Sequence, residues 1–148
     1  MGENMIFKQA VEDWPDEIVV HTDGASRGNP GPASTGVVGY NLDGEILFEY
    51  AEHLGEQTNN YAEYFAVLRS FQLSLDKGVK RVTLRSDSQL LVRQLLGEYK
   101  VKSETLRPLY LECSELMGRF EKANIEHVRR EQNKKADQLA NLALDRMG

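Results

Sequence analysis

Four carboxylates lie beside predicted strand ends and in predicted helices, where side chains from distant parts of a chain can meet. Asp23 and Asp87 each close a short run rich in β-branched residues. Glu63 lies in the first turn of one predicted helix, and Asp137 lies in the last helix. Mg²⁺ takes oxygen ligands, and two such ions can promote an in-line phosphoryl displacement. The four acids together therefore predict a site for divalent cations.

Each acid also has an ordinary structural explanation. Asp23 precedes a glycine, as turn-forming aspartates often do. Glu63 has the spacing of a capping box with Asn60, and Asp87 has the position of a helix N-cap. Asp137 is harder to explain in this way, because it borders the apolar stripe of its helix, where an ionised carboxylate needs a compensating positive charge. The sequence has no cluster of His and Cys, which argues against zinc.

The hydrophobic pattern predicts five strands and four helices. We expect strands near residues 18–23, 35–42, 45–53, 81–87 and 123–129, and helices near residues 60–77, 88–96, 103–122 and 133–147. Residues 27–32 are rich in Gly and Pro and predict a loop, and Asp43-Gly44 predicts a type I′ hairpin turn. The order implies an α/β fold with a mixed sheet and helices on both faces. In such sheets, active residues gather at the carboxyl ends of parallel strands.

Length and charge limit the possible functions. The 148 residues fit one domain, which we place at residues 16–148 after an N-terminal extension of uncertain order at residues 1–15. The net charge of −5 argues against tight, non-specific binding to nucleic acid. The lone cysteine, Cys113, predicts a buried thiol. No secretory signal or membrane-spanning run is visible, so we expect a cytoplasmic protein with no membrane partner. No exposed apolar stripe is left unassigned, so we also expect a monomer.

Four segments resemble, in order, the motifs of type 1 ribonucleases H. They are TDGASRGNPGP at residues 22–32 with Gly36 after it, TNNYAE at residues 58–63, SDSQ at residues 86–89 and NKKAD at residues 133–137. Residues 97–102 resemble a subgroup of these enzymes. One such motif is weak, but four in order at compatible spacing are specific. The resemblance covers about residues 17–147 and implies a ribonuclease H-like fold with a five-stranded mixed sheet, three antiparallel strands being followed by parallel ones.

The resemblance implies an endonuclease that hydrolyses the RNA strand of RNA–DNA hybrids and leaves 5′-phosphate and 3′-hydroxyl ends. Asp23, Glu63, Asp87 and Asp137 would be the catalytic residues and would hold two Mg²⁺ or Mn²⁺ ions. Substrate-binding positions of the family match Gly24, Asn29, Thr58, Asn59, Asn60, Ser88 and Gln89. Amide side chains can both donate to and accept from the 2′-hydroxyl groups that distinguish RNA from DNA.

Two features depart from the common family pattern. Residues 129–135 contain no histidine where many members have one before the last acid, so Arg130 and Glu131 are candidate substitutes. The basic protrusion of some members is also missing, and residues 97–108 carry only three cations, at Lys100, Lys102 and Arg107. We therefore expect hybrid binding that is weak and strongly dependent on salt.

Two other functions stay open at the level of sequence. One is a non-catalytic nucleic-acid-binding module of the same fold, and the other is a related nuclease that also cuts double-stranded RNA, because A-form duplexes have similar minor grooves. The presence of all four acids favours the enzyme. His127 lies inside a predicted strand and is interpreted as a packing residue, and His21 and His53 are interpreted as structural residues.

Overall fold

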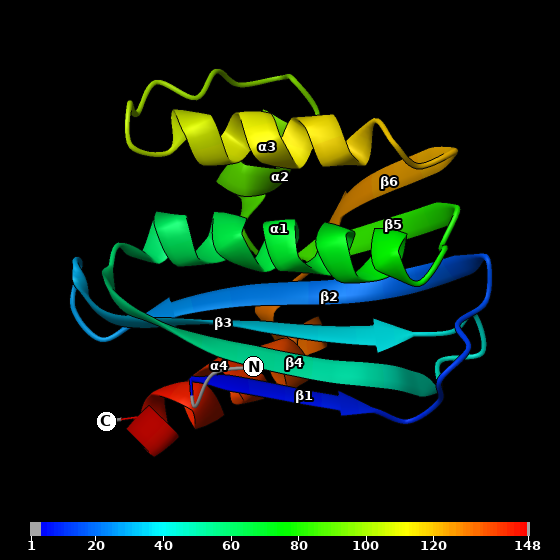
Figure 1. Ribbon diagram of the computed structural model, residues 1–148. Coiled ribbons are helices and arrows are strands. Elements are labelled where there is room, and N and C mark those ends of the chain that lie inside the picture. The colour runs from blue at the N-terminus through cyan, green and yellow to red at the C-terminus, as the bar shows by residue number, and fades with distance from the viewer. Residues whose placement is uncertain (1–3, 148) are drawn as a thin grey trace.

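Residues 17–22 and 81–86 alternate in burial, as strands with one face in the core do, whereas residues 31–40 are buried almost throughout. These strands belong to one mixed sheet, and helices cover both of its faces (Figure 1). The computed structural model describes residues 4–147. Over this range the strands are β1 (Met5–Gln9), β2 (Glu17–Ser26), β3 (Gly31–Tyr40), β4 (Ile46–Gln57), β5 (Arg81–Ser86) and β6 (Lys122–His127). The helices are α1 (Asn59–Asp76), α2 (Gln89–Leu95), α3 (Arg107–Met117) and α4 (Lys134–Met147), with a short 3₁₀ turn, η1, at Arg130–Gln132.

The described part of the sheet has six strands in the order β1-β4-β3-β2-β5-β6, one more than the sequence predicted. Strands β1 to β4 pair in antiparallel fashion, whereas β2, β5 and β6 are parallel. The additional strand is β1, which pairs with β4 along the edge of the sheet within the predicted N-terminal extension. Residues 1–3 of that extension, and Gly148, lie outside the described residues.

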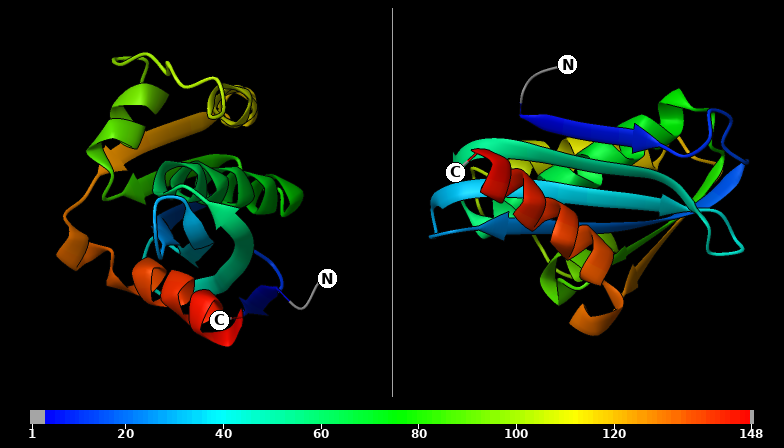
Figure 2. Two further views of the ribbon diagram at one scale, coloured as in Figure 1. Left: turned by 90° about the vertical axis from the view of Figure 1, so that its left-hand side faces the viewer. Right: turned by 90° about the horizontal axis from the view of Figure 1, so that it is seen from below.

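Helices α1 and α4 pack on opposite faces of the central strands, as Figure 2 shows. Neighbouring residues of β3 point to opposite sides, so Thr35 Oγ1 donates to Ala62 O of α1 while Ser34 Oγ donates to Ala140 O of α4. The larger core lies on the α1 side and includes the predicted buried thiol of Cys113, which is fully buried. In the described residues, no helix combines the length and hydrophobicity that a bilayer crossing requires.

The hairpin between β3 and β4 forms where the sequence predicted it, but the predicted turn type is wrong. A type I′ turn needs positive φ at both central residues, and only Gly44 has it, with φ of 84°. The loop is longer than two residues, because Asn41 N donates to Glu45 O and Gly44 N donates to Asn41 O. The Asn41 side chain also accepts from the backbone of Asp43 and Glu45, which stabilises this wider turn.

Several predicted boundaries also shift. The Gly- and Pro-rich loop is shorter than residues 27–32, because β3 begins at Gly31, where Arg27 N donates to Pro32 O. Helix α3 occupies only the centre of its predicted range: it ends at Met117, with Pro108 in its first turn and Gly118 as its C-cap. Proline is tolerated there because the first turn of a helix needs no backbone donor.

Candidate active site

Three of the four predicted acids meet where the parallel pairing of β2 and β5 ends. Asp23, Glu63 and Asp87 each offer a carboxylate oxygen, and these oxygens all lie within 4.8 Å of one another. The last parallel pair between β2 and β5 joins Thr22 to Ser86. The residues that follow them, Asp23 and Asp87, therefore lie side by side just beyond the end of this parallel pairing. Glu63 reaches this point from the first turns of α1. The predicted convergence at the carboxyl ends of parallel strands is therefore confirmed.

The structural alternatives for these acids are wrong. Asp23 lies inside β2, which continues to Ser26, and not in a turn. The N-cap of α1 is Thr58, whose side chain accepts from the backbone of the helix, so Glu63 is not needed for a capping box. The N-cap of α2 is Ser88 and not Asp87. The three carboxylates are thus free of local capping roles.

The electrostatics of the cluster are unfavourable without a cation. Asp23 and Glu63 are only 5% and 6% exposed. Burial, and then the negative charges of Glu63 and Asp87, raise the pKa of Asp23 well above its ordinary value. Burial and the charge of Asp87 likewise raise the pKa of Glu63. Within the described chain, the buried Oε2 atom of Glu63 has no hydrogen-bond partner. A divalent cation would satisfy that oxygen and offset the repulsion among the three acids.

Asp137 belongs to the same pocket but not to the tight cluster. The pocket has a volume of 330 Å³, and its lining includes the three clustered acids and Asp137. Asp137 lies on the exposed side of α4, where Asn141 Nδ2 donates to its Oδ1 at 3.2 Å. Its carboxyl also contributes to the raised pKa of Asp23, so the two groups are close enough to interact.

Of the two candidate substitutes for the loop histidine, only Arg130 lines the pocket. Its positive charge lowers the pKa of Glu63 and so opposes the effect of the neighbouring carboxylates. Glu131 follows Arg130 in the exposed turn η1 and does not line the pocket.

Several predicted substrate-binding residues surround the acids. Gly24 and Asn59 line the pocket itself. Asn29, on the loop before β3, accepts from Asn59 N at 3.1 Å, which joins this loop to the start of α1. Thr58 and Asn60 are exposed beside Asn59. Gly24, Asn29 and residues 58–60 thus lie in the pocket or next to a residue that lines it, and we call them the rim.

The remaining predicted substrate-binding residues lie at the start of α2. Ser88 Oγ accepts from Leu91 N, so it has a capping role there. Gln89 lines a separate hollow between α2 and β6 rather than the acid pocket. His127 is exposed at the end of β6 and lines that same hollow, so its interpretation as a packing residue is wrong.

Asn133 enters the site although the sequence assigned it no role. It is 1% exposed, and its Nδ2 donates to Thr22 O at 2.8 Å and to Asp87 Oδ2 at 3.4 Å. Its Oδ1 faces Nδ1 of His21 at 3.2 Å. The signals in the sequence were its place as the first residue of the NKKAD motif and its position one helical turn before Asp137, and neither is specific enough to predict these contacts.

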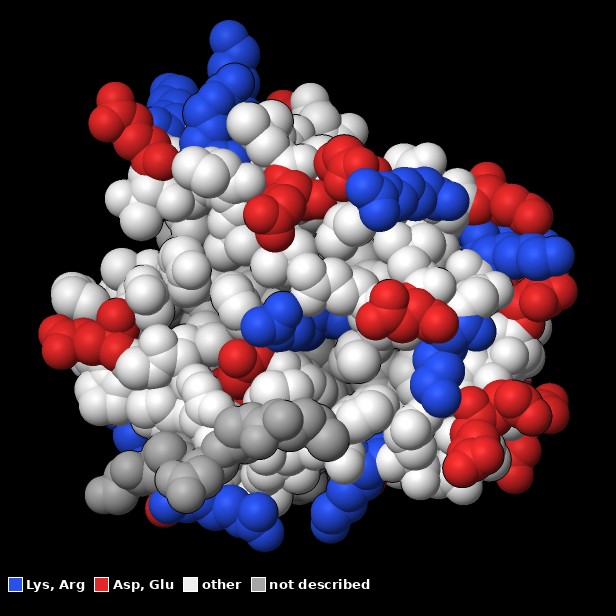
Figure 3. Space-filling model, in the orientation of Figure 1, with Lys and Arg blue, Asp and Glu red and all other residues white. Residues whose placement is uncertain are grey.

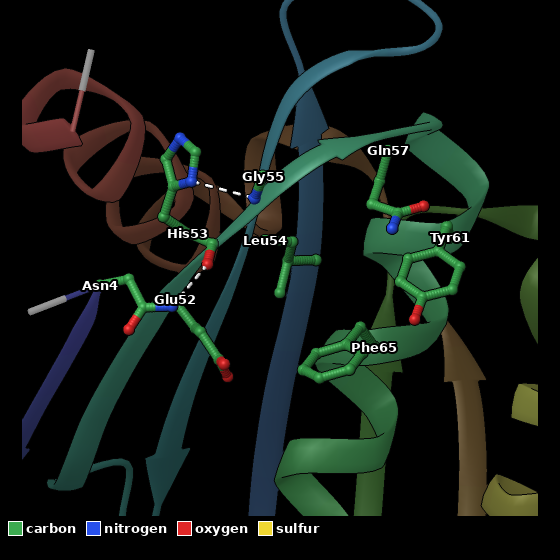
Figure 4. Close-up of a pocket in the computed structure, with 8 residues that line it drawn as sticks. All are labelled: Asn4, Glu52, His53, Leu54, Gly55, Gln57, Tyr61 and Phe65. Atoms are coloured by element: carbon green, nitrogen blue, oxygen red, sulfur yellow. Dashed lines mark hydrogen bonds between the residues drawn. The ribbon is translucent and has the colours of Figure 1, made fainter. Parts of the chain in front are cut away.

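A larger hollow of 470 Å³ lies elsewhere, between β4 and the start of α1 (Figure 4). Its one acidic group, Glu52, is already paired with Arg69 at 2.8 Å. His53 accepts from Gly55 N through its side chain, as Figure 4 also shows. Because these polar groups are satisfied within the protein, the smaller pocket with the unpartnered carboxylate is the stronger candidate for chemistry.

Comparison with known proteins agrees with this geometry. A family model described as "Reverse transcriptase-like" matches residues 21–143. Ribonuclease HI of Halobacterium salinarum is 44% identical over 133 residues, which are 90% of this chain and 67% of that protein. A bifunctional protein of Mycobacterium tuberculosis is 38% identical over 130 residues, which are 87% of this chain but only 36% of the longer relative.

Solved structures give the same assignment. The crystal structure of RNase H1 from Halobacterium salinarum has a TM-score of 0.85 and 42% identity, covering 87% of this chain and 98% of that one. LC11-RNase H1 in complex with an RNA/DNA hybrid has a TM-score of 0.83 and 42% identity, covering 88% and 98%. The predicted fold is therefore confirmed apart from the additional strand. By its fold, its ordered motifs and these relatives, the chain belongs to the type 1 ribonuclease H family.

Proposed function

We propose that this protein is an endonuclease that hydrolyses the RNA strand of RNA–DNA hybrids, leaving 5′-phosphate and 3′-hydroxyl ends. The observation that carries the proposal is the cluster of Asp23, Glu63 and Asp87, three acids from three separate elements in a pocket open to solvent. A relative of the same fold, at 42% identity, was solved with an RNA/DNA hybrid. Family membership and an intact acid cluster together favour catalysis over a non-catalytic binding role.

The residues fit divalent cations. The donors are all carboxylate oxygens, which suit Mg²⁺ and Mn²⁺, and Oε2 of Glu63 is buried without a partner in the described chain. We infer that Asp23, Glu63, Asp87 and Asp137 hold two such ions. When bound, the two ions would activate water and offset the charge that develops on the phosphate.

In the reaction, a water oxygen attacks phosphorus in line with the bond to the 3′-oxygen. That bond breaks, the 3′-oxygen takes a proton, and the phosphate remains on the 5′-oxygen of the next nucleotide. Arg130 lines the pocket with the acids, so its guanidinium can bind the scissile phosphate. In this way Arg130 would replace the loop histidine of other members. Glu131, outside the pocket, is the weaker candidate.

Recognition of the hybrid is assigned to the rim beside the acids. Asn29, Asn59 and Asn60 carry amides that can bind 2′-hydroxyls and base edges, and Thr58 would lie near the phosphates of the DNA strand. Gly24 lines the pocket beside Asp23, and Ser88 and Gln89 would extend the contact along α2. The resulting interface is local, which suits a chain with a net charge of −5.

The charge pattern supports a local interface. On the face that Figure 3 shows, acidic and basic side chains are mostly interspersed, acidic side chains gather at the lower right, and basic side chains form no continuous patch there. Binding through long-range attraction to phosphate is therefore weaker than in a basic nucleic-acid-binding protein. A monomer in the cytoplasm, expected from the sequence, belongs to the same proposal.

The test is cleavage of an end-labelled RNA–DNA hybrid with Mg²⁺ or Mn²⁺, beside single-stranded RNA, duplex DNA and duplex RNA. Wild-type protein should cut only the RNA strand of the hybrid. Asp87→Asn should abolish cleavage, whereas Asp43→Asn, the same change at an exposed hairpin residue outside the pocket, should not.

Other outcomes would replace the proposal. Hybrid binding without cleavage in either metal would favour the non-catalytic module. Cleavage of duplex RNA at a rate similar to that of the hybrid would extend the substrate class to A-form duplexes in general.

A further inference from the structure

One buried amide connects the elements that carry three of the acids. The side chain of Asn133 donates to Thr22 O, the residue before Asp23, and to Oδ2 of Asp87 itself. Its backbone carbonyl accepts from Asp137 N at 3.2 Å, which begins the hydrogen bonding of α4. Asn133 therefore contacts β2, the end of β5 and α4 at the point where they meet.

The orientation of this amide is fixed by its neighbours. Thr22 O can only accept, so the atom of Asn133 that faces it is the donor Nδ2, and Oδ1 faces the other way. The atom opposite Oδ1 is Nδ1 of His21, which must therefore carry a hydrogen. The His21 ring is held in turn by an edge contact with Tyr40, with centroids 5.3 Å apart. An amide turned by 180° would place two acceptors together at Thr22.

The geometry points to Asn133 as a positioning residue for the acid cluster, with His21 setting the orientation of its amide. This inference rests on the proposed function for its effect on rate, but its effect on metal affinity can be measured without substrate. Groups that orient metal ligands typically change metal affinity or activity on the order of 10- to 100-fold when they are replaced. Asn133 qualifies because it orients Asp87 directly and fixes the backbone beside Asp23 and Asp137.

The first test replaces the amide donor. Asn133→Asp has nearly the same shape and keeps an acceptor for His21, but it presents oxygen to Thr22 O and to Asp87. We expect Mn²⁺ affinity, measured by titration calorimetry without nucleic acid, to weaken by about 10- to 100-fold. We also expect kcat on the hybrid to fall by a similar factor while KM for the hybrid stays unchanged. Asn124→Asp, at a half-buried asparagine of β6 outside the pocket, is the matched control and should leave both quantities unchanged.

The second test acts through the histidine alone. His21→Phe keeps a ring beside Tyr40 but removes the donor to Asn133, whereas His21→Asn places an amide nitrogen near the position of Nδ1. The Phe variant should lose Mn²⁺ affinity and kcat, and the Asn variant should recover most of both. A residue that only filled space would give the opposite order. This pair decides the matter if thermal melting shows that Asn133→Asp does not fold.

The results separate this inference from the proposed function. If wild type does not cut the hybrid but Asn133→Asp still weakens Mn²⁺ binding, the proposed function fails and the positioning role stands. If wild type cuts the hybrid and the Asn133 and His21 variants match it in metal affinity and kcat, the positioning role is overturned and the function stands.

Discussion

Gly24 of β2 lies directly against the backbone of Glu63 in α1. A Cβ atom added at Gly24 would lie 2.5 Å from the carbonyl carbon of Ala62 and 2.8 Å from Cα of Glu63, closer than real Cβ atoms approach backbone. Only glycine fits after Asp23, because the backbone of α1 comes this close to the strand. Close approach of the two backbones is what brings the carboxylates of Asp23 and Glu63 together.

Gly24→Ala should separate the two acids. Because a backbone contact cannot yield as a flexible side chain does, we expect a loss of about 1–3 kcal/mol in the free energy of unfolding and a large loss of cleavage activity. Chemical denaturation and the hybrid assay measure the two effects. Gly118→Ala is the control, since its nearest neighbour would be 3.5 Å from the new Cβ. Equal stability and activity for both variants would contradict the close approach.

Neutralising one acid should stabilise the metal-free protein while removing its activity. In Asp23→Asn, the repulsion from Glu63 and Asp87 is lost at a position that is 5% exposed. We expect a gain of about 1 kcal/mol, or roughly 2–4 °C in Tm for a domain of this size, in the presence of EDTA. Saturating Mg²⁺ should raise the Tm of wild type more than that of the variant. A lower Tm for Asp23→Asn in EDTA would show that the cluster is not under repulsion.

The stability of the metal-free protein should fall as pH rises from 5 to 8. The pKa values of Asp23 and Glu63 are raised in the folded state, chiefly by burial, whereas in the unfolded chain they are near 4. Between these values the folded state binds more protons than the unfolded state, so raising the pH favours unfolding. Urea denaturation in EDTA at several pH values measures the slope. The slope should be smaller in Glu63→Gln, and an equal slope in the variant would assign it to other groups.

Hybrid binding should depend on the three cations of the segment that replaces the basic protrusion. Lys100, Lys102 and Arg107 are all exposed. If each contacts one phosphate, the association constant should fall roughly 40-fold between 50 and 200 mM salt. The double change of Lys100 and Lys102 to Gln should reduce the slope of log K against log salt by about 1.8. Lys8→Gln, at an exposed residue of β1, is the control, and an unchanged slope in the double variant would exclude the segment from the interface.

The sequence was sufficient to predict a residue's place in the fold where its local pattern and its tertiary role coincide. Asp87 follows a strand of alternating burial, so its position at the edge of the sheet could be predicted from periodicity alone. Strand β1 could not, because Lys8 and Gln9 are exposed and the strand is defined by its pairing with β4 rather than by its own residues. The type I′ turn was predicted from Asp43-Gly44, but the side chain of Asn41 stabilises a wider loop.

In the active site too, local motifs could be predicted from the sequence, whereas contacts between distant residues could not. The motifs identified the acids, but not that Gly24 is required by the backbone of α1, nor that Asn133 contacts both Thr22 and Asp87. These relationships join residues more than 35 positions apart in the chain, and no local periodicity encodes them. Asp137 borders the apolar stripe of α4 as predicted, but its side chain is exposed, so the expectation that it needs a compensating positive charge there is wrong.

Arg130 and Glu131 can be separated by one pair of substitutions. Arg130 lines the acid pocket and its charge acts on Glu63, whereas Glu131 does neither. A guanidinium beside the scissile phosphate would stabilise charge that develops during cleavage, so Arg130→Ala should lower kcat on the order of 100-fold. Glu131→Ala should change kcat by less than about twofold, as exposed side chains outside a site usually do. Single-turnover cleavage of the hybrid distinguishes a slower chemical step from slower product release. A large effect of Glu131→Ala with a normal Arg130→Ala would assign the role of the missing loop histidine to the carboxylate instead.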